Sequence, residues 1–351
     1  MSDIGDRKSH HLDLAQWAQV NGNEINKFFN YEPLLGSFPK SSIDLPPLKI
    51  HKSSLDAPLW VSSMTGGTGQ AGPINKSLAK VCGEFGLGLG LGSCRPLLES
   101  EEYFEDFNLR PLMGDKGVLF ANFGVAQLEE ELKRDELKKV FSLCERLHVD
   151  GFFIHINPLQ EWYQPEGDRW YRSPLELIKD IQSLKPSHLA LGVKEVGQGF
   201  GPESMRSLIE LEPEVIEFGA FGGTNFSVLE ELRTKKANKN EELTKTSELC
   251  FVGHTASEMV SNVNQILNDR GSNQTHTTFI ISGGIRSFLE GHFLVENCEG
   301  QACYGMAKPF LEAASGGDEK VRRFVTRELE GLTMARAFLK AKALNQLPGR
   351  S

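Results

Sequence analysis

The chain has 351 residues, of which 24% are charged and 39% hydrophobic, and its 38 basic and 47 acidic side chains give a formal net charge of −9. This acidic balance excludes the broad basic surface of a nucleic-acid-binding protein, so we expect no nucleic-acid partner. The first residues contain no apolar signal segment, and no apolar run approaches the roughly 20 residues of a membrane span, so we expect no membrane association. The six cysteines form no Cys-x-x-Cys pair, which predicts reduced thiols in a cytoplasmic protein.

Short apolar runs rich in β-branched and aromatic residues alternate along the chain with amphipathic stretches. In the stretch 126–147, apolar residues fall at helical spacing and charges occupy the other face. The eight predicted strands are Leu59–Met64, Leu87–Ser93, Gly117–Gly124, Gly151–Asn157, Leu189–Val196, Val215–Ala220, Thr277–Ser282 and Ala302–Met306.

This alternation of strands and helices predicts a parallel sheet with βα crossovers, and the continuous apolar strands predict burial on both faces. Eight units favour closure into a single (β/α)8 TIM-barrel domain over 1–351, with a doubly wound open sheet as the alternative. We expect residues 1–55 to form an N-terminal extension over the barrel mouth. The charged segment 233–248 has no apolar face and is predicted to be a mobile loop after the sixth strand.

Polar residues and glycines concentrate just after the predicted strands, whose ends meet at the barrel mouth where active sites lie. Ser63, Met64 and Thr65 lead into the glycine-rich turn of VSSMTGGTG, which either lets the backbone approach a ligand or is a turn without one. After the second strand, LGSCRP provides Ser93 and Arg95. Arg95 is able to clamp a phosphate, although an isolated arginine is more often a surface residue.

The third and fourth strands end in side chains suited to a cofactor and a metal. Asn122 supplies both a donor and an acceptor, as flavin recognition requires, or occupies a turn. The sequence HINPLQEW then brings together His155, Asn157, Gln160 and Glu161, a density that favours a functional site. A carboxylate here suits Mg²⁺, which takes one or two carboxylates together with phosphate oxygens and water.

Four further motifs follow the remaining strands. Lys194 lies within an apolar strand, so it needs an anionic partner, which is either a ligand or a buried carboxylate at Glu195 or Glu217. The glycine-rich turn GAFGGTN contains Thr224. The motifs SGGIRS and YGMAKP predict the phosphate site that barrels build from the loops after strands seven and eight and a helix N-terminus.

Taken together, these motifs resemble the type 2 isopentenyl-diphosphate delta-isomerases, flavin-dependent (β/α)8 enzymes that interconvert isopentenyl and dimethylallyl diphosphate in isoprenoid biosynthesis. The landmarks run from RKSHHL near residue 7 to GMAKPF near residue 305, and SSMTGG and HINPLQE are the most specific. GGIR is shared with many FMN barrels, including the α-hydroxy-acid oxidases. The resemblance implies FMN, Mg²⁺, NADPH as the flavin reductant, a small diphosphate substrate, and a cytoplasmic homo-oligomer (tetramer or octamer).

The resemblance also implies roles for individual residues. Gln160 and His155 would be catalytic, and Glu161 would bind the metal. The substrate would contact Arg7, Lys8, Ser93, Arg95, His155, Asn157 and Gln160. FMN would contact Ser63, Met64, Thr65, Ser93, Asn122, Lys194, Thr224, Gly283, Gly284, Arg286, Gly305, Met306 and Ala307.

The sequence departs from the family pattern at four positions, which raises the question of whether the FMN site is altered. His10, Gly219, His254 and Gln301 stand where the family usually has an acidic residue, serine, proline and alanine. Two other functions remain as alternatives, the first because it shares the GGIR motif and the second because of these departures. One is an FMN-dependent hydroxy-acid oxidase or dehydrogenase, and the other is a non-catalytic FMN-binding protein.

Overall fold

The computed structural model describes residues 4–63, 71–237, 247–271 and 275–346. Eight parallel strands close into a barrel in the order β10-β11-β4-β5-β6-β7-β8-β9, which confirms the predicted fold and shows that the open-sheet alternative is wrong. Each strand lies within a predicted run. They are β4 (Leu59–Val61), β5 (Gly88–Gly90), β6 (Val118–Gly124), β7 (Gly151–Ile156), β8 (Ala190–Glu195), β9 (Val215–Glu217), β10 (Thr278–Ser282) and β11 (Ala302–Met306).

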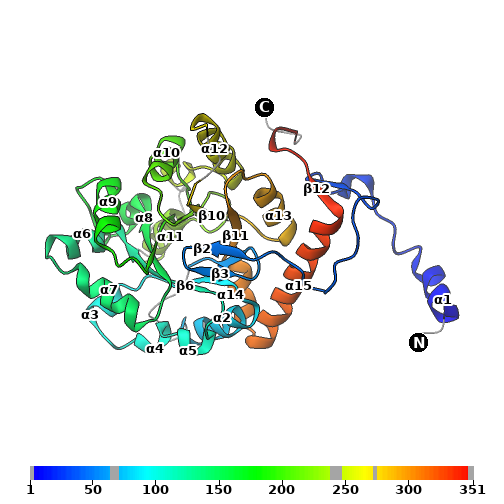
Figure 1. Cartoon of the computed structure of the whole chain (residues 1–351), viewed down its shortest axis with the longest axis horizontal. Coiled ribbons are helices and arrows are strands. Elements are labelled where there is room, and N and C mark those ends of the chain that lie inside the picture. The colour runs from blue at the N-terminus through cyan, green and yellow to red at the C-terminus, as the bar shows by residue number, and fades with distance from the viewer. Residues whose placement is uncertain (1–3, 64–70, 238–246, 272–274, 347–351) are drawn as a thin grey trace.

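The helices surround the barrel and bury their apolar faces against it (Figure 1). They are α2 (Ala71–Phe85), α3 (Pro96–Glu99), α4 (Phe104–Phe107), α5 (Arg110–Met113), α6 (Val125–Lys133), α7 (Leu137–Arg146), α8 (Pro158–Tyr163), α9 (Pro174–Leu184), α10 (Pro202–Leu211), α11 (Phe226–Ala237), α12 (Ala256–Asp269), α13 (Phe288–Glu296), α14 (Lys308–Ala314) and α15 (Asp318–Phe338). The short 3-10 helices of the described ranges are η1 (Gly22–Glu24), η2 (Glu248–Phe251) and η3 (Leu344–Gln346).

One end of the barrel interior is filled with apolar side chains. Trp60 packs edge-on against Phe120 and Phe153. The antiparallel hairpin of β2 (Leu48–Ile50) and β3 (Ser53–Leu55) adds the buried side chains of Ile50 and Leu55 to this cluster. This hairpin seals the amino-terminal end of the barrel. The polar residues predicted to form the site follow the strands and lie at the opposite end.

The stretch 126–147 is helical, as the spacing of its apolar residues predicted. It forms α6 and α7, and the chain turns between them at Asp135, which has a φ of +58°. One expectation needs correction. The predicted loop 233–248 is helical at its start because α11 continues to Ala237. In this part of the helix Arg233 pairs with Glu230, and Lys235 pairs with Glu231. Residues 238–246 lie outside the described part of the chain.

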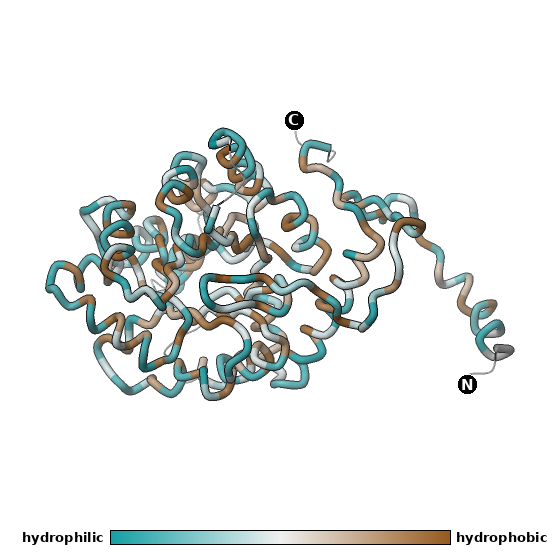
Figure 2. The backbone as a smooth tube through the Cα atoms, in the orientation of Figure 1, coloured by the Kyte–Doolittle hydropathy of each residue, from teal (hydrophilic) through white to brown (hydrophobic). Residues whose placement is uncertain are grey.

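The N-terminal segment lies apart from the barrel. α1 (Ile4–Leu14) lies beyond α15 (Figure 1), and hydrophobic residues recur along the segment that joins it to the domain (Figure 2). The side chains of Leu12, Trp17 and Val20 are exposed. The chain joins the domain where β1 (Phe29–Tyr31) pairs with β12 (Leu339–Ala341). No helix in the described ranges is long and apolar enough to cross a membrane, and all six cysteines are free thiols.

Candidate functional site

A cavity of about 770 Å³ opens at the carboxyl ends of the barrel strands. It receives residues from the end of every barrel strand, as the convergence argument predicted. Most of the predicted site residues line this one cavity. They are Ser63, Ser93, Arg95, Asn122, His155, Asn157, Gln160, Glu161, Lys194, Thr224, Gly283, Gly284, Arg286, Gly305, Met306 and Ala307.

Four predicted residues are not placed in the cavity. Met64 and Thr65 lie outside the described residues. Arg7 and Lys8 are exposed on α1, and neither contributes to the cavity wall. The structure therefore shows α1 away from the mouth, while β2 and β3, which end the predicted extension of residues 1–55, lie at the opposite end of the barrel. The place of α1 over the mouth stays a prediction.

His155 lies in the cavity wall on β7, and its Nδ1 is 2.9 Å from Oδ1 of Asn122 on β6. Burial, with a smaller contribution from the charge of Lys194, lowers the pKa of His155 from 6.5 to about 3. The imidazole is therefore neutral at pH 7, and the contact with an amide oxygen assigns its N–H to Nδ1. In this state His155 acts as a hydrogen-bonding group, and an anionic ligand would be needed to stabilise its charged form.

We expect the His155 ring to remain neutral from pH 8 to pH 5 in the ligand-free protein. The unfolded chain protonates this imidazole near pH 6.5, whereas the folded chain does so only near pH 3. The stability that the neutral ring contributes therefore falls as the pH drops from about 6.5 towards 3. ¹⁵N NMR of the imidazole nitrogens measures the charge directly, with a His155→Gln variant to assign the signal. A midpoint near 6.5 in the ligand-free protein would contradict the burial argument.

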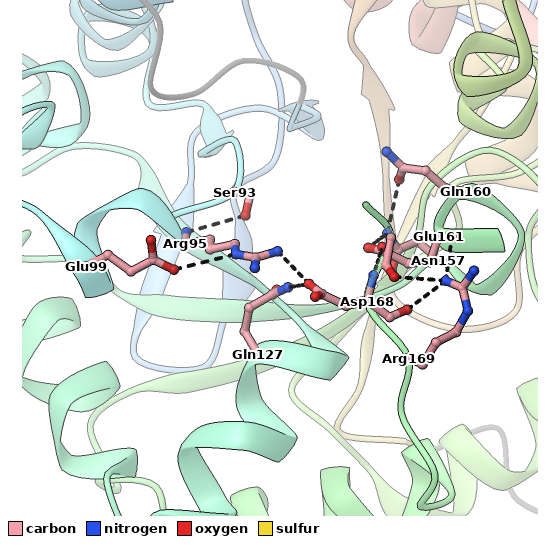
Figure 3. A network of polar contacts seen from close by, with 10 residues as sticks. Ser93, Arg95, Glu99, Gln127, Asn157, Gln160, Glu161, Asp168 and Arg169 are labelled. Carbon is pink, nitrogen blue, oxygen red and sulfur yellow. Dashed lines mark hydrogen bonds and ion pairs between the residues drawn. The ribbon is translucent and has the colours of Figure 1, made fainter. Parts of the chain in front are cut away.

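A chain of hydrogen bonds runs along α8 into the following loop (Figure 3). Nδ2 of Asn157 donates to Oε1 of Gln160 at 3.1 Å and to Oε1 of Glu161 at 2.8 Å. Oε2 of Glu161 accepts the backbone N–H of Asp168 at 2.7 Å. Glu161 is buried, and each of its oxygens keeps a lone pair beyond these bonds, so its carboxylate is able to serve as one metal ligand.

The described residues contain no group of three or more His, Cys, Asp or Glu side chains arranged to hold a metal ion. Coordination of Mg²⁺ by Glu161 together with phosphate oxygens and water stays a prediction.

Two residues that the sequence did not identify complete this network. Glu230 on α11 accepts a hydrogen bond from Nε2 of Gln160 at 3.4 Å, and its other oxygen accepts from Nε of Arg233 at 2.7 Å. Asp168, in the loop after α8, accepts from Arg95 and from Gln127. Neither acid follows a strand directly, so the pattern that identified the other residues could not reveal them.

Lys194 lies on β8 between His155 on β7 and Glu217 on β9, in register with both. Its ammonium group donates to the backbone carbonyl of Glu195 at 2.9 Å and forms no ion pair with the carboxylate of either Glu195 or Glu217. The structure therefore gives no support to the buried-ion-pair alternative. Lys194 is a cation in the cavity wall, and its contact with an anionic ligand stays a prediction.

The loops after β10 and β11 form a backbone cradle at one side of the cavity. Gly283 and Gly284 have φ angles of +104° and +78°, and a Cβ on Gly283 would lie 2.1 Å from the carbonyl oxygen of Ala220. Only glycine fits this conformation and this approach. The Arg286 side chain is exposed at the cavity and has no ion-pair partner among the described residues.

Several buried polar atoms in the cavity wall lack hydrogen-bond partners among the described residues. They are Oγ of Ser62 and Ser63, Oε1 of Gln127 and Oε2 of Glu217. Buried polar atoms are nearly always satisfied in folded proteins, so these atoms indicate a polar ligand. The cradle and these free donors and acceptors fit a phosphate-bearing cofactor such as FMN.

The departures from the family pattern lie at positions with clear structural roles. Gly219 has a φ of +52°, and a Cβ there would lie 2.1 Å from the carbonyl oxygen of Glu195, so serine does not fit this backbone. His254 ties two mouth loops together through its backbone, which bonds to Gln198 and Phe221. Gln301 bonds to the carbonyl of Lys49 in the hairpin at the opposite end of the barrel. His10 lies on α1, outside the cavity wall.

Comparison with solved structures relates this fold to flavin-associated barrels. A mutant flavocytochrome b2 with pyruvate bound superposes with a TM-score of 0.59 at 16% identity, covering 99% of this chain and 85% of that one. A mandelate oxidase mutant with an FMN adduct gives 0.55 at 12% identity, covering 90% and 88%. At these identities the likeness shows the fold alone. The barrel and its polar cavity at the strand ends define a (β/α)8-barrel enzyme.

The sequence comparison identifies the family. An isopentenyl-diphosphate delta-isomerase of Nostoc sp. is 32% identical over 314 residues, 88% of this chain and 84% of its own length. The isomerase of Rickettsia bellii is 28% identical over 344 residues, 97% of this chain and 95% of its own length. No family model matches. The chain belongs to the isopentenyl-diphosphate delta-isomerase family, as the resemblance predicted.

Proposed function

We propose that this protein interconverts isopentenyl and dimethylallyl diphosphate, with reduced FMN and Mg²⁺ bound in the cavity at the barrel mouth and NADPH as the flavin reductant. The observation that carries the proposal is one cavity lined by the HINPLQE residues, the buried ammonium of Lys194 and the glycine cradle. The extensive likeness to isopentenyl-diphosphate delta-isomerases supports the same reaction. We further propose a cytoplasmic homo-oligomer, which is an expectation from the resemblance.

The proposed reaction moves a double bond by adding a proton at one end and removing a proton at the other, so there is no net oxidation. Reduced FMN, when bound, supplies the electron-rich group that stabilises the electron-deficient transition state. Gln160 would face the reacting carbons, with its amide oriented by Asn157 on one side and Glu230 on the other. Arg95 and His155 would bind the diphosphate, and this remote binding energy would fix the alkene in place.

The residues around the cradle and Lys194 would hold the cofactor. The flavin phosphate would bind the backbone N–H groups of Gly283 and Gly284 and the side chain of Arg286. Lys194 would supply a positive charge to the reduced flavin. The free hydroxyl of Ser63 and the Asn122 amide would bind other polar atoms of the cofactor.

Arg286→Ala is expected to weaken FMN binding roughly 10- to 100-fold, because a charge-assisted hydrogen bond to phosphate is lost. The fold should be unaffected, since the Arg286 side chain is exposed and unpaired. Fluorescence titration with FMN measures the affinity. Arg206→Ala removes an arginine on α10 that pairs with Asp269 and should not affect FMN binding. Equal FMN affinity in the Arg286 variant and the wild type would refute the phosphate assignment.

Among the described residues, the cavity wall has as many basic as acidic side chains, so a diphosphate together with a flavin phosphate requires further cations. The basic members are Arg95, Lys194, Arg286 and Lys308, and the acidic members are Glu161, Glu195, Glu217 and Glu312. Arg7 and Lys8 on α1 are candidates for these cations. The proposal requires α1 to move to the mouth when substrate binds.

Deleting residues 1–8 should raise the KM for isopentenyl diphosphate by roughly tenfold or more, because charge-assisted contacts with the diphosphate are lost. FMN binding and thermal stability should change little, because the side chains of Arg7 and Lys8 are exposed. Lys8→Ala should show part of the effect, and Asp13→Asn on the same helix should show none. Wild-type kinetics in the truncated protein would show that the segment takes no part in binding.

The proposed activity is tested by incubating the purified protein with isopentenyl diphosphate, FMN, NADPH and Mg²⁺ and analysing the products. We expect dimethylallyl diphosphate to form until the two isomers reach equilibrium. Absence of this product with fully reduced, protein-bound FMN would contradict the proposal.

A further inference from the structure

We propose that Asp168 is a positioning residue that holds the guanidinium group of Arg95 in place to receive the diphosphate. This inference rests on the proposed function, which assigns Arg95 to the diphosphate. Asp168 lies outside the cavity wall, but its carboxylate contacts two residues of the wall, Arg95 and Gln127.

One carboxylate oxygen of Asp168 connects the segments that follow three successive strands (Figure 3). Oδ2 of Asp168 accepts from Nη1 of Arg95 at 2.5 Å and from Nε2 of Gln127 at 2.9 Å. Arg95 follows β5, Gln127 is in the helix after β6, and Asp168 lies in the loop between α8 and α9, after β7. Asp168 therefore fixes the position of Arg95 relative to the neighbouring part of the mouth.

The backbone that carries Asp168 is anchored independently of its side chain. Its N–H donates to Oε2 of Glu161, and Nη1 of Arg169 donates to the carbonyl oxygen of Glu161 at 2.6 Å and to those of Gly167 and Asp168 at 3.1 Å. A side-chain substitution at Asp168 leaves all these bonds available. Such a variant is therefore expected to release Arg95 without displacing Glu161.

Arg95 needs such an anchor because its long side chain is 47% exposed. An exposed arginine samples many rotamers, and a ligand that binds it must restrict them. The bond to Asp168 uses one of five N–H donors and leaves the others for the diphosphate. Glu99 is the other carboxylate near Arg95, but it is 3.9 Å from Nε and 73% exposed, so it is a poor anchor.

The opposite interpretation is that Asp168 is an electrostatic liability, since a carboxylate near the diphosphate repels it. The two interpretations predict different variants. If position matters, Asp168→Asn retains an acceptor for Arg95 and rescues binding, whereas Asp168→Ala weakens it. If charge repulsion dominates, both variants bind the anion more tightly than the wild type.

The test is a double-mutant cycle on the FMN-loaded protein, with inorganic pyrophosphate and Mg²⁺ as the probe in isothermal titration. We expect Asp168→Ala to raise the Kd for pyrophosphate about tenfold, Asp168→Asn to stay within about threefold, and Asp168→Ala to have no further effect in an Arg95→Ala background. In turnover, Asp168→Ala should raise the KM for isopentenyl diphosphate and leave kcat nearly unchanged. Glu99→Ala, which removes the exposed neighbour, should match the wild type.

Two results would overturn the inference while the proposed function stands. They are an Asp168→Ala variant that binds pyrophosphate as tightly as the wild type or more tightly, and an equal loss of binding with and without Arg95. A wild-type protein that neither binds pyrophosphate nor converts isopentenyl diphosphate would instead refute the proposed function, and the inference with it.

Discussion

Glu161→Gln is expected to remove the Mg²⁺ dependence of turnover and to lower kcat/KM on the order of 10² to 10³, because the metal that Glu161 would hold neutralises charge on the diphosphate and so supports substrate binding. Among the described residues, Glu161 is the one acidic side chain of the HINPLQE segment, and its buried carboxylate keeps lone pairs free for a metal. Glutamine retains the shape and one acceptor oxygen but loses the charge.

The experiment measures initial rates over a Mg²⁺ titration for the wild type and the variant. Glu166→Gln is the matched control, because Glu166 lies in the next loop and its exposed carboxylate pairs with Arg233. This control should keep the wild-type response to Mg²⁺. A Glu161→Gln variant that Mg²⁺ still stimulates to the wild-type extent would show that the metal binds elsewhere.

Lys194→Met should have opposite effects on the empty and the cofactor-bound protein. Without ligand, the buried ammonium of Lys194 has one carbonyl partner and no carboxylate pair with its neighbours Glu195 and Glu217, so its replacement is expected to stabilise the fold by about 1–2 kcal/mol. With reduced FMN, the loss of this charge should weaken binding roughly 10- to 100-fold. Thermal unfolding without FMN and titration with reduced FMN measure the two effects.

Lys185→Met provides the control for this pair of measurements. Lys185 is also largely buried, but it is paired with Glu214 at 2.9 Å and also donates to the carbonyl of Leu189. Its replacement leaves Glu214 without that ammonium partner, so the protein should lose stability while FMN binding stays unchanged. A Lys194→Met protein that is destabilised without ligand and binds reduced FMN normally would identify Lys194 as a structural lysine.

The barrel was predictable because its signals are local. Apolar strands alternate with amphipathic helices, and polar residues such as Asn122 and His155 follow the strands directly, so closure of the barrel brings them together. The sequence could not decide whether the partner of Lys194 is a carboxylate or a ligand, because either one satisfies the rule that buried charges have partners. The structure shows the ammonium group bonded to the carbonyl of Glu195 and gives no support to the ion pair, while the ligand role stays a prediction.

The contacts of Asp168 and Glu230 could not be predicted in this way. Both side chains come from positions beyond the strand ends, and their partners Arg95 and Gln160 lie 73 and 70 residues away in the chain. The hairpin that seals the barrel was missed for a related reason, since its strands are only three residues long and carry no clear periodicity. These features depend on long-range packing.

The hydroxy-acid oxidase alternative has little support beyond the fold. Flavocytochrome b2 and mandelate oxidase share the barrel at 16% and 12% identity, whereas the Nostoc isomerase shares 32%. The non-catalytic alternative depended on the sequence departures. Two of these, Gly219 and Gln301, are accommodated by the backbone and by a hydrogen bond away from the mouth.

The most direct test of the account is the redox balance during turnover. The protein is loaded with reduced FMN without oxygen, supplied with Mg²⁺ and isopentenyl diphosphate, and followed by product analysis together with the flavin absorption spectrum. We predict many molecules of dimethylallyl diphosphate per flavin while the flavin remains reduced. Oxidation of one flavin for each product molecule, or reduction of oxidised FMN by a 2-hydroxy acid without any isomerisation, would contradict the account.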